Sequence, residues 1–203
     1  MSCLTILNDG RIVSGSADKN IIIYNKISFR PDIIIKEHCD TIMCLIQLSS
    51  GEWLICSKEI IILKIKYLSY EIIQRLKNNT NYVLKDNSEY KINFKINTNG
   101  ACYTIIQTKE NEICYSTSNN NTICFYDLIE KKIKSSLLNI SKTHRGSSQF
   151  IMISKNWLLI PGENRISIIN INEYKLIKII EVPGANWILG VCILSEDMII
   201  AGS

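Results

Sequence analysis

The chain has 203 residues, of which 46% are hydrophobic and 21% are charged, with a formal net charge of +4. This length and composition fit one or two globular domains and exclude a disordered chain. The lysines are scattered along the sequence, so no basic arm is predicted and nucleic-acid binding is not indicated.

The first residues, Met1 to Thr5, show no basic region followed by an apolar run, so no secretory signal is predicted. The longest apolar runs are far shorter than the ~20 residues that a membrane-spanning helix needs. We therefore expect a cytoplasmic protein, with the nucleus as a second location, and reduced cysteines. His38, Cys39 and Cys44 lie close together without a second pair of ligands, so we expect no metal and no cofactor.

A short phrase recurs along the chain and begins at residues 12, 53, 113, 157 and 198, at intervals of 41, 60, 44 and 41 residues. In a β-rich sequence, a period of about 40–45 residues is typical of propeller blades. Isoleucine-rich segments separated by polar turns predict the strands. These cover 3–7, 11–16, 21–25 and 32–36, then 41–48, 52–57 and 60–65, then 103–108, 112–116, 122–127 and 133–138, then 149–154, 156–160, 165–171 and 175–180, and finally 187–194 and 198–201.

The 60-residue interval predicts an insertion over about 70–97 in the second repeat. Residues 71–77 fit either a fourth strand or a short helix, and 82–97 fit an added hairpin. Residues 90–97 alternate apolar and polar side chains, which is typical of a half-buried strand. The predicted blade boundaries are 1–36, 37–98, 99–140, 141–181 and a partial blade over 182–203.

The repeats resemble those of the WD40 family. Residues 8–25 are similar to the second and third strands of that family's blades, with Tyr24-Asn25 where the family has Trp-Asp. His38 begins a segment similar to the family's Gly-His entry into the first strand. Phe125-Tyr126-Asp127 stands at the Trp-Asp position of the third repeat. The resemblance implies an all-β propeller of WD40-like four-stranded blades, with about four and a half blades in this chain.

In that family, a His, a Ser or Thr, an Asp and the Trp form a hydrogen-bonded network within a blade. No repeat of this chain holds the full set, because Leu63 and Ile169 fill the Trp position of the second and fourth repeats. The resemblance carries a place in such a network to Ser14, Ser16, Asp18, Tyr24, His38, Ser57, Tyr126, Asp127 and His144.

Rings of this family usually have seven blades, and a stack that is open at both ends exposes apolar faces and strand edges. Three explanations fit a chain with four and a half blades. It is a fragment of a longer protein, it pairs with another subunit that supplies further blades, or it closes as a smaller and irregular propeller.

Catalysis is not predicted, because the sequence shows no nucleophile–base pair, phosphate-binding loop or metalloprotease motif. The resemblance implies a non-catalytic scaffold or recognition module that binds other proteins. One alternative is the substrate-recognition part of a larger enzyme complex such as a ubiquitin ligase. Another is a propeller enzyme of a different family, which needs polar residues around a central funnel.

In such propellers, the loops that enter the first strands share a face with the turns between the second and third strands. At this face we predict partner contacts by Asp40, His144, Arg145 and Trp187, since Trp and Arg are frequent in binding hot spots. Packing between blades is the alternative for Trp187. Trp53 and Trp157 fall in second strands, so both are predicted to be core residues.

The predicted hairpin is a second candidate surface. Lys85, Lys91 and Lys95 would lie along it and could meet an acidic partner. The alternative is a solvated edge whose lysines prevent pairing with other strands.

Overall fold

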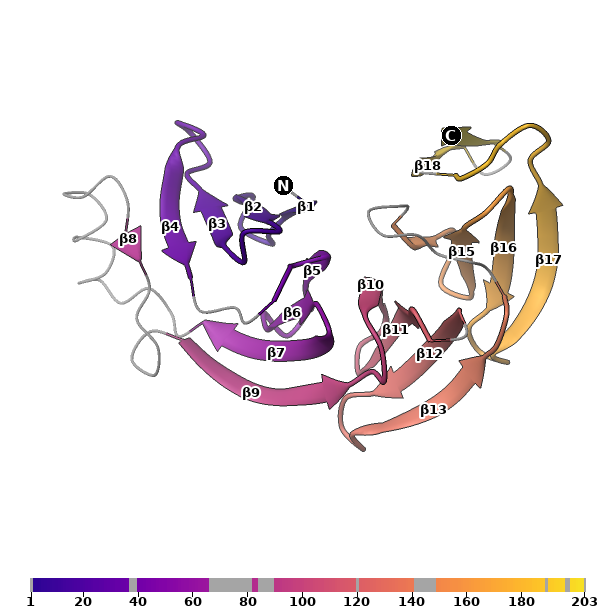
Figure 1. Ribbon diagram of the computed structural model, residues 1–203, viewed down its shortest axis with the longest axis horizontal. Helices are drawn as coiled ribbons and strands as arrows, with labels where there is room; N and C mark the ends of the chain where they lie inside the picture. The colour runs from indigo at the N-terminus through magenta and orange to yellow at the C-terminus, as the bar shows by residue number, and fades with distance from the viewer. Residues whose placement is uncertain are drawn as a thin grey trace. The chain divides into compact units, whose positions relative to one another are not determined.

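The computed structural model describes residues 2–36, 40–65, 82–83, 90–119, 121–140, 149–188, 190–195 and 198–202, with the backbone alone at 63–65, 82–83 and 90–92. The elements in these ranges are all β-strands, and no helix among them could cross a membrane. The chain divides into two compact units, Met1–Thr98 and Asn99–Ser203. We number the four larger sheets blades 1 to 4 in chain order and call the last, two-stranded sheet the half-blade (Figure 1).

Blade 1 consists of four antiparallel strands, β1 (Cys3–Ile6), β2 (Ile12–Gly15), β3 (Ile21–Tyr24) and β4 (Pro31–Ile35). Isoleucines dominate these strands because β-branched side chains are stiff and pack well on a pleated surface. Gly10 closes the predicted turn between β1 and β2 with a left-handed φ of 84°. A short strand, β8 (Tyr82–Val83), adds to the outer edge of β4 in parallel.

Blade 2 consists of β5 (Cys44–Gln47), β6 (Trp53–Cys56), β7 (Glu59–Ile65) and β9 (Tyr90–Asn97). The predicted hairpin over 82–97 is wrong, because its two halves pair with different sheets: β8 with β4, and β9 with β7. β9 is therefore the fourth strand of blade 2, and the extra chain of this repeat lies between β7 and β9. The fourth strand or helix predicted at 71–77 lies outside the described residues.

One apolar cluster joins blade 1 to blade 2 within the first unit. Its members are buried, and Trp53 is only 3% exposed, as predicted. A Cβ at Gly15 would lie 2.5 Å from Cγ2 of Ile42 and 2.7 Å from Sγ of Cys3, so no larger residue fits here unless the strands move. The cluster contains Leu7, Val13, Ile21, Ile23, Ile33, Ile35, Ile42, Leu45, Trp53 and Ile55.

The second unit contains blade 3, blade 4 and the half-blade. Most of its strands agree with prediction, but the first strand of blade 4, predicted over 149–154, forms only at Ile151–Met152. The strands are β10 (Cys102–Lys109), β11 (Glu112–Thr117), β12 (Thr122–Asp127) and β13 (Lys132–Leu137) in blade 3; β14 (Ile151–Met152), β15 (Trp157–Pro161), β16 (Arg165–Asn170) and β17 (Lys175–Glu181) in blade 4; and β18 (Gly190–Ser195) and β19 (Met198–Gly202) in the half-blade.

Two further clusters bury the inner strands of the second unit. Cys114, Phe125 and Leu158 belong to the cluster between blades 3 and 4. Leu159 and Ile166 belong to the cluster between blade 4 and the half-blade, against which Val191 and Ile199 pack. β11 is buried along its whole length, and burial on both faces of a strand explains its continuous apolar run.

The pairing register corrects the alignment of the repeats. Asp127 pairs with Glu112, and Asn170 pairs with Trp157, so Trp157 occupies the place of Glu112 at the start of the second strand. The recurring phrase of blade 4 therefore begins at Leu158, one residue later than the sequence suggested. The prediction that Trp157 is a core residue is wrong, since its side chain is 46% exposed at the end of the strand.

The turn between the third and fourth strands has one construction in blades 1, 3 and 4. The side chains of Asn25, Asp127 and Asn170 accept hydrogen bonds from the backbone N–H groups two and three residues later, at 2.8 to 3.3 Å. Asn and Asp side chains favour such turns because they mimic a backbone carbonyl. Four residues after each of them, Phe29, Lys131 and Tyr174 adopt left-handed φ values of 54°, 52° and 52°.

The fourth strand of every blade also carries a bulge at the same place in the register. A bulge inserts one unpaired residue and re-aims its side chain. The inserted residues are Asp32, Asn93, Lys134 and Ile177.

Candidate functional site

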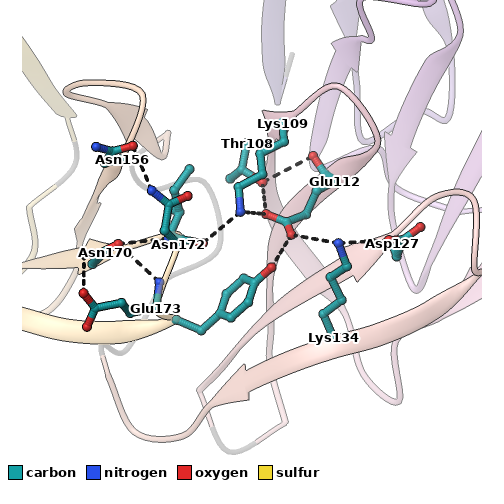
Figure 2. Close-up of polar contacts among 11 residues, drawn as sticks. Thr108, Lys109, Glu112, Asp127, Lys134, Asn156, Asn170, Asn172 and Glu173 are labelled. Atoms are coloured by element: carbon teal, nitrogen blue, oxygen red, sulfur yellow. Dashed lines mark hydrogen bonds and ion pairs between the residues drawn. The ribbon is translucent and has the colours of Figure 1, made fainter.

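Turns lie at both ends of every blade. We call the end with the turn between the second and third strands the b–c edge, and the opposite end the c–d edge. The partner contacts predicted from the sequence belong largely to the b–c edge. The structure adds a cluster of charged and polar side chains at the c–d edge of blades 3 and 4, which Figure 2 shows.

Glu112 is the centre of this cluster. It is the first residue of β11, and its side chain is 2% exposed. Oε1 accepts a hydrogen bond from Oγ1 of Thr108 at 2.8 Å, and Oε2 accepts one from the Tyr174 hydroxyl at 2.5 Å. The ammonium groups of Lys109 and Lys134 lie 3.7 and 3.6 Å from the carboxylate. A buried carboxylate needs such partners, because burial otherwise penalises its charge.

Tyr174 reaches Glu112 from the next blade along the chain. Its left-handed backbone conformation, in the turn between β16 and β17, is uncommon for a bulky residue. The ring packs on Phe125 of blade 3, with centroids 4.9 Å apart, and Nζ of Lys109 lies 5.3 Å from the ring centroid. Burial and the hydrogen bond to Glu112 raise the pKa of Tyr174 to about 12.

The two lysines tie the cluster to the backbone and to the bulge. Lys109 donates to the carbonyl of Ile171 in blade 4 at 3.2 Å. Lys134, the bulged residue of β13, lies 3.0 Å from the carboxylate of Asp127. The N–H of Glu130 and the Lys134 ammonium hold the pKa of Asp127 below its ordinary value.

This arrangement joins two blades and offers little to a substrate. The two carboxylates face two lysines, so the charges balance, and the tyrosine hydroxyl is committed to Glu112. A tyrosine with a raised pKa stays protonated at neutral pH and is a poor base. We refer to Glu112, Tyr174, Lys109, Lys134 and Asp127 as the interblade clasp.

In blade 1, the predicted network residues form two separate contacts, of which the second lies at the b–c edge. The hydroxyls of Ser14 and Tyr24 lie 3.1 Å apart. The N–H of Asp18 donates to Oγ of Ser16 at 3.5 Å, and the N–H of Asn20 donates to the Asp18 carboxylate at 3.1 Å. That backbone hydrogen bond is the main cause of the lowered pKa of Asp18.

The remaining network candidates lie in other blades. Oγ of Ser57 donates to the carbonyl of Glu59 at 3.1 Å and closes the short turn between β6 and β7. Tyr126 is buried in β12, and Asp127 belongs to the interblade clasp at the c–d edge. His38 and His144 lie outside the described residues, so their place in a network stays a prediction.

Two predicted partner contacts are engaged in local pairs. The Asp40 carboxylate accepts the Thr41 N–H at 2.8 Å and lies 3.3 Å from the Lys58 ammonium; both interactions lower its pKa. Lys95 lies 2.7 Å from Glu59 across blade 2. Arg145, Lys85 and the side chain of Lys91 lie outside what the structure describes, so their contacts with a partner stay a prediction.

Trp187 is half-buried in the loop that leaves blade 4. Two backbone hydrogen bonds tie this loop to the turn between β15 and β16: Val182 N–H to Asn164 at 2.8 Å, and Ile188 N–H to Gly162 at 3.1 Å. Arg165 begins β16 at the same edge, and its buried Nε has no partner among the described residues. Two backbone hydrogen bonds therefore fix the loop that carries Trp187 at the same edge as Arg165.

Sequence reasoning missed the interblade clasp. The sequence did hold a signal for the turn that contains Tyr174. Asn25, Asp127 and Asn170 stand at matching places in their repeats, and the structure shows a left-handed residue four positions after each of them. The contact between Glu112 and Tyr174 spans 62 residues and gives no local pattern.

Chemistry for catalysis does not assemble in the described parts of the chain. No group of three His, Cys, Asp or Glu side chains in these ranges could hold a metal ion. The described cysteines are free, and six of the seven are buried or half-buried. Burial raises the pKa of the Cys114 thiol well above its ordinary value, which makes it a poor nucleophile.

The fold is that of WD40 β-propeller domains. The WD40 β-propeller domain of Doa1 superposes with a TM-score of 0.68 at 15% identity, over 98% of this chain and 59% of that one. The β-propeller domain of Cps50 (Swd1) from Myceliophteria thermophila superposes with a TM-score of 0.64 at 13% identity, over 96% of this chain and 59% of that one. This chain thus spans less than two thirds of either domain. No family model and no curated protein matches the sequence.

Proposed function

We propose that this protein is a non-catalytic interaction scaffold that binds other proteins at the b–c edge of its blades. The observation that carries the proposal is the half-buried Trp187 on a loop that two backbone hydrogen bonds hold at the same edge as Arg165. Trp and Arg side chains are frequent binding hot spots, and a Trp side chain loses little entropy on burial because it has only two rotatable bonds.

Other features support the proposal. The fold is shared with WD40 propeller domains, and the charged groups of the interblade clasp satisfy one another. Free, mostly buried thiols fit a reducing compartment such as the cytoplasm or the nucleus. Arg11, Lys58 and Lys95 each lie beside a carboxylate, and cations that are neutralised in this way favour a protein partner over nucleic acid.

The test is capture of proteins from a lysate of the source cells on the immobilised chain, with Trp187→Ala and Trp157→Ala as matched variants. Both tryptophans are partly exposed in blade 4 or its exit loop, but they lie at opposite edges. We expect Trp187→Ala to lose specific proteins that the wild type and Trp157→Ala retain. Equal retention by all three, or loss only with Trp157→Ala, would contradict the proposal.

A further inference from the structure

Two cysteines of blade 2 lie directly opposite each other. Cys44 begins β5, Cys56 ends β6, and the antiparallel register pairs the two residues. Directly opposed residues of an antiparallel pair point to the same face of the sheet, with α-carbons about 4.5 to 5.5 Å apart. This separation falls within the range of roughly 4.4 to 6.8 Å that a disulfide spans. The structure holds both residues as thiols, in positions from which a disulfide could form.

The two strands are held together on both sides of this pair. Towards the b–c edge, the N–H of Met43 donates to the carbonyl of Cys56 at 2.8 Å. Further out, the Lys58 ammonium lies 3.3 Å from the Asp40 carboxylate. In the other direction, the register continues to the end of β5 without a shift. A bond between the two sulfurs therefore requires no change of register.

This opposition of two thiols is particular to blade 2 among the described cysteines. Each of the others lies opposite residues of another type, so the register offers it no second sulfur. The opposed residues are Gly15 for Cys3, Thr117 for Cys102, Ile106 and Phe125 for Cys114, Tyr115 and Ser136 for Cys124, and Ile200 for Cys192.

The two thiols of the pair are buried to different extents. Cys44 is 7% exposed and Cys56 is 0% exposed. Access limits the reactions of thiols, so burial disfavours attack by bulky disulfides. Hydrogen peroxide is a much smaller oxidant. The residual exposure of Cys44 makes it the residue that reacts first, with Cys56 beside it as the resolving thiol.

We propose that Cys44 and Cys56 form a reversible disulfide when the protein meets hydrogen peroxide. Sγ of Cys44 attacks one peroxide oxygen, the O–O bond breaks, and Cys44 becomes a sulfenic acid as one water leaves. Sγ of Cys56 then attacks Sγ of Cys44, the S–O bond breaks, and a second water leaves. In sum, the two thiols lose two hydrogens and two electrons, and the peroxide is reduced to two waters.

The disulfide would staple the first strand of blade 2 to the second, next to Asp40 and Lys58 at the b–c edge. Such a link restricts the unfolded chain and so raises stability. Thiol reductants reverse it, as is typical of the transient, redox-sensing disulfides of reducing compartments. The inference involves neither Trp187 nor a partner protein, so it stands independently of the proposed function.

The experiment treats the folded wild-type chain with hydrogen peroxide, alkylates the remaining thiols and maps the peptides by mass spectrometry. Trypsin releases residues 37–58 as one peptide, and cleavage after Glu52 then separates Cys56 from Cys39 and Cys44. We expect the two fragments to stay joined until dithiothreitol is added, with both thiols of the pair lost to alkylation. Cys39→Ser should keep the joined fragments, and Cys44→Ser should lose them.

Two cysteines of the same sample serve as internal controls. Cys114 is as deeply buried as Cys56 but has no cysteine opposite it, so it should keep an alkylatable thiol. Cys192 is exposed, and its oxidation shows that the peroxide has acted. In urea unfolding, peroxide should raise the midpoint of the wild type, and dithiothreitol should reverse the shift. The Cys44→Ala variant should show no such rise.

Three results would overturn the proposal. The first is oxidation of Cys192 in a sample that contains no joined fragments. The second is a joined product that survives in Cys44→Ser and disappears in Cys39→Ser, which assigns the bond to Cys39. The third is disulfide formation by Cys114 as frequent as that by Cys44, which shows that unfolding, and not the register of blade 2, selects the sulfurs.

Discussion

Blades 2 and 3 are built on the same four-stranded plan, but they treat their turns and charges differently. In blade 3, Asp127 caps a tight turn between the third and fourth strands, and Glu112 is buried among charged partners. In blade 2, the corresponding turn is replaced by the long connection from β7 to β9. Glu52, which holds the place of Glu112, is partly exposed and bonds to Asn93.

What the two blades share shows what fixes the sheet. Both have the bulge in the fourth strand, between Ile62 and Leu63 of the facing strand in blade 2 and between Phe125 and Tyr126 in blade 3. In both, the bulged residue contacts the glutamate at the start of the second strand: Asn93 with Glu52, and Lys134 with Glu112. The register therefore follows the buried apolar pattern and the bulge, and it tolerates the loss of a turn.

The largest effect that separates the two blades should come from their phenylalanines. Phe125 of blade 3 is fully buried, whereas Phe94 of blade 2 is half-buried. Phe125→Ala should lower the free energy of unfolding by about 3–5 kcal/mol, because it leaves a cavity between blades 3 and 4. Phe94→Ala should cost less than about 2 kcal/mol. Urea unfolding measures the free energy of unfolding of both variants. Equal losses in the two variants would contradict the difference in packing between Phe125 and Phe94.

The next comparison removes one glutamate from each blade. Glu112→Ala should cost about 2–3 kcal/mol, because it removes charge-assisted hydrogen bonds and leaves the Tyr174 hydroxyl without its acceptor, whereas Thr108 keeps its hydrogen bond to the carbonyl of residue 112. Glu52→Ala should change stability by less than about 0.5 kcal/mol, as expected for an exposed polar contact. A Glu112→Ala variant as stable as Glu52→Ala would show that the interblade clasp contributes nothing.

The interblade clasp should also give blade 3 an alkaline sensitivity that blade 2 lacks. The pKa of Tyr174 is about 12 in the folded chain, above its ordinary value of 10.0. The stability that the Tyr174 hydroxyl contributes through this hydrogen bond is fully present below pH 10.0 and is lost as the pH rises towards 12. The difference in unfolding free energy between wild type and Tyr174→Phe should shrink over this range. A difference that is constant across it would contradict the assigned hydrogen bond.

The smallest effect concerns the turn of blade 3. Asp127→Asn should lower the free energy of unfolding only slightly at neutral pH, because Asn25 and Asn170 already form the same turn with an amide. Asp127→Ala should lower it further, since the backbone N–H groups lose their acceptor, and urea unfolding of both variants checks this order.

The pH dependence of the same position follows from its lowered pKa. The folded carboxylate holds its proton less tightly than the unfolded one, so its contribution is present at neutral pH and is lost as the pH falls through the folded pKa. The stability difference between wild type and Asp127→Asn should therefore vanish in acid. Persistence of that difference at acid pH would contradict the pairing with Lys134.

Much of the fold could be read from the sequence, because isoleucine-rich strands and Asn- or Gly-containing turns are local signals. For the strand over 122–127, the predicted and the observed bounds are the same at both ends. β9 was recognised as a half-buried strand but assigned to the wrong partner, since its pairing with β7 depends on contacts across an insertion. Trp157 was misplaced because a one-residue shift of register moves a side chain from the core to the edge.

The sites were harder to predict than the strands. Turn residues such as Asp18 and Ser57 act through neighbours two residues away, and the sequence shows these directly. Glu112 depends on Tyr174 and Lys134, which reach it from another blade and from a bulged position. A contact between residues far apart in the chain leaves no pattern in one sequence, and neither does a bulge.

The most direct test of this account is the capture of proteins from a lysate on the immobilised wild-type chain and on its Trp187→Ala and Trp157→Ala variants. The account holds that the b–c edge of the blades binds other proteins. It therefore predicts that Trp187→Ala loses specific proteins that the wild type and Trp157→Ala retain. Equal retention by all three chains, or a loss only with Trp157→Ala, would contradict it.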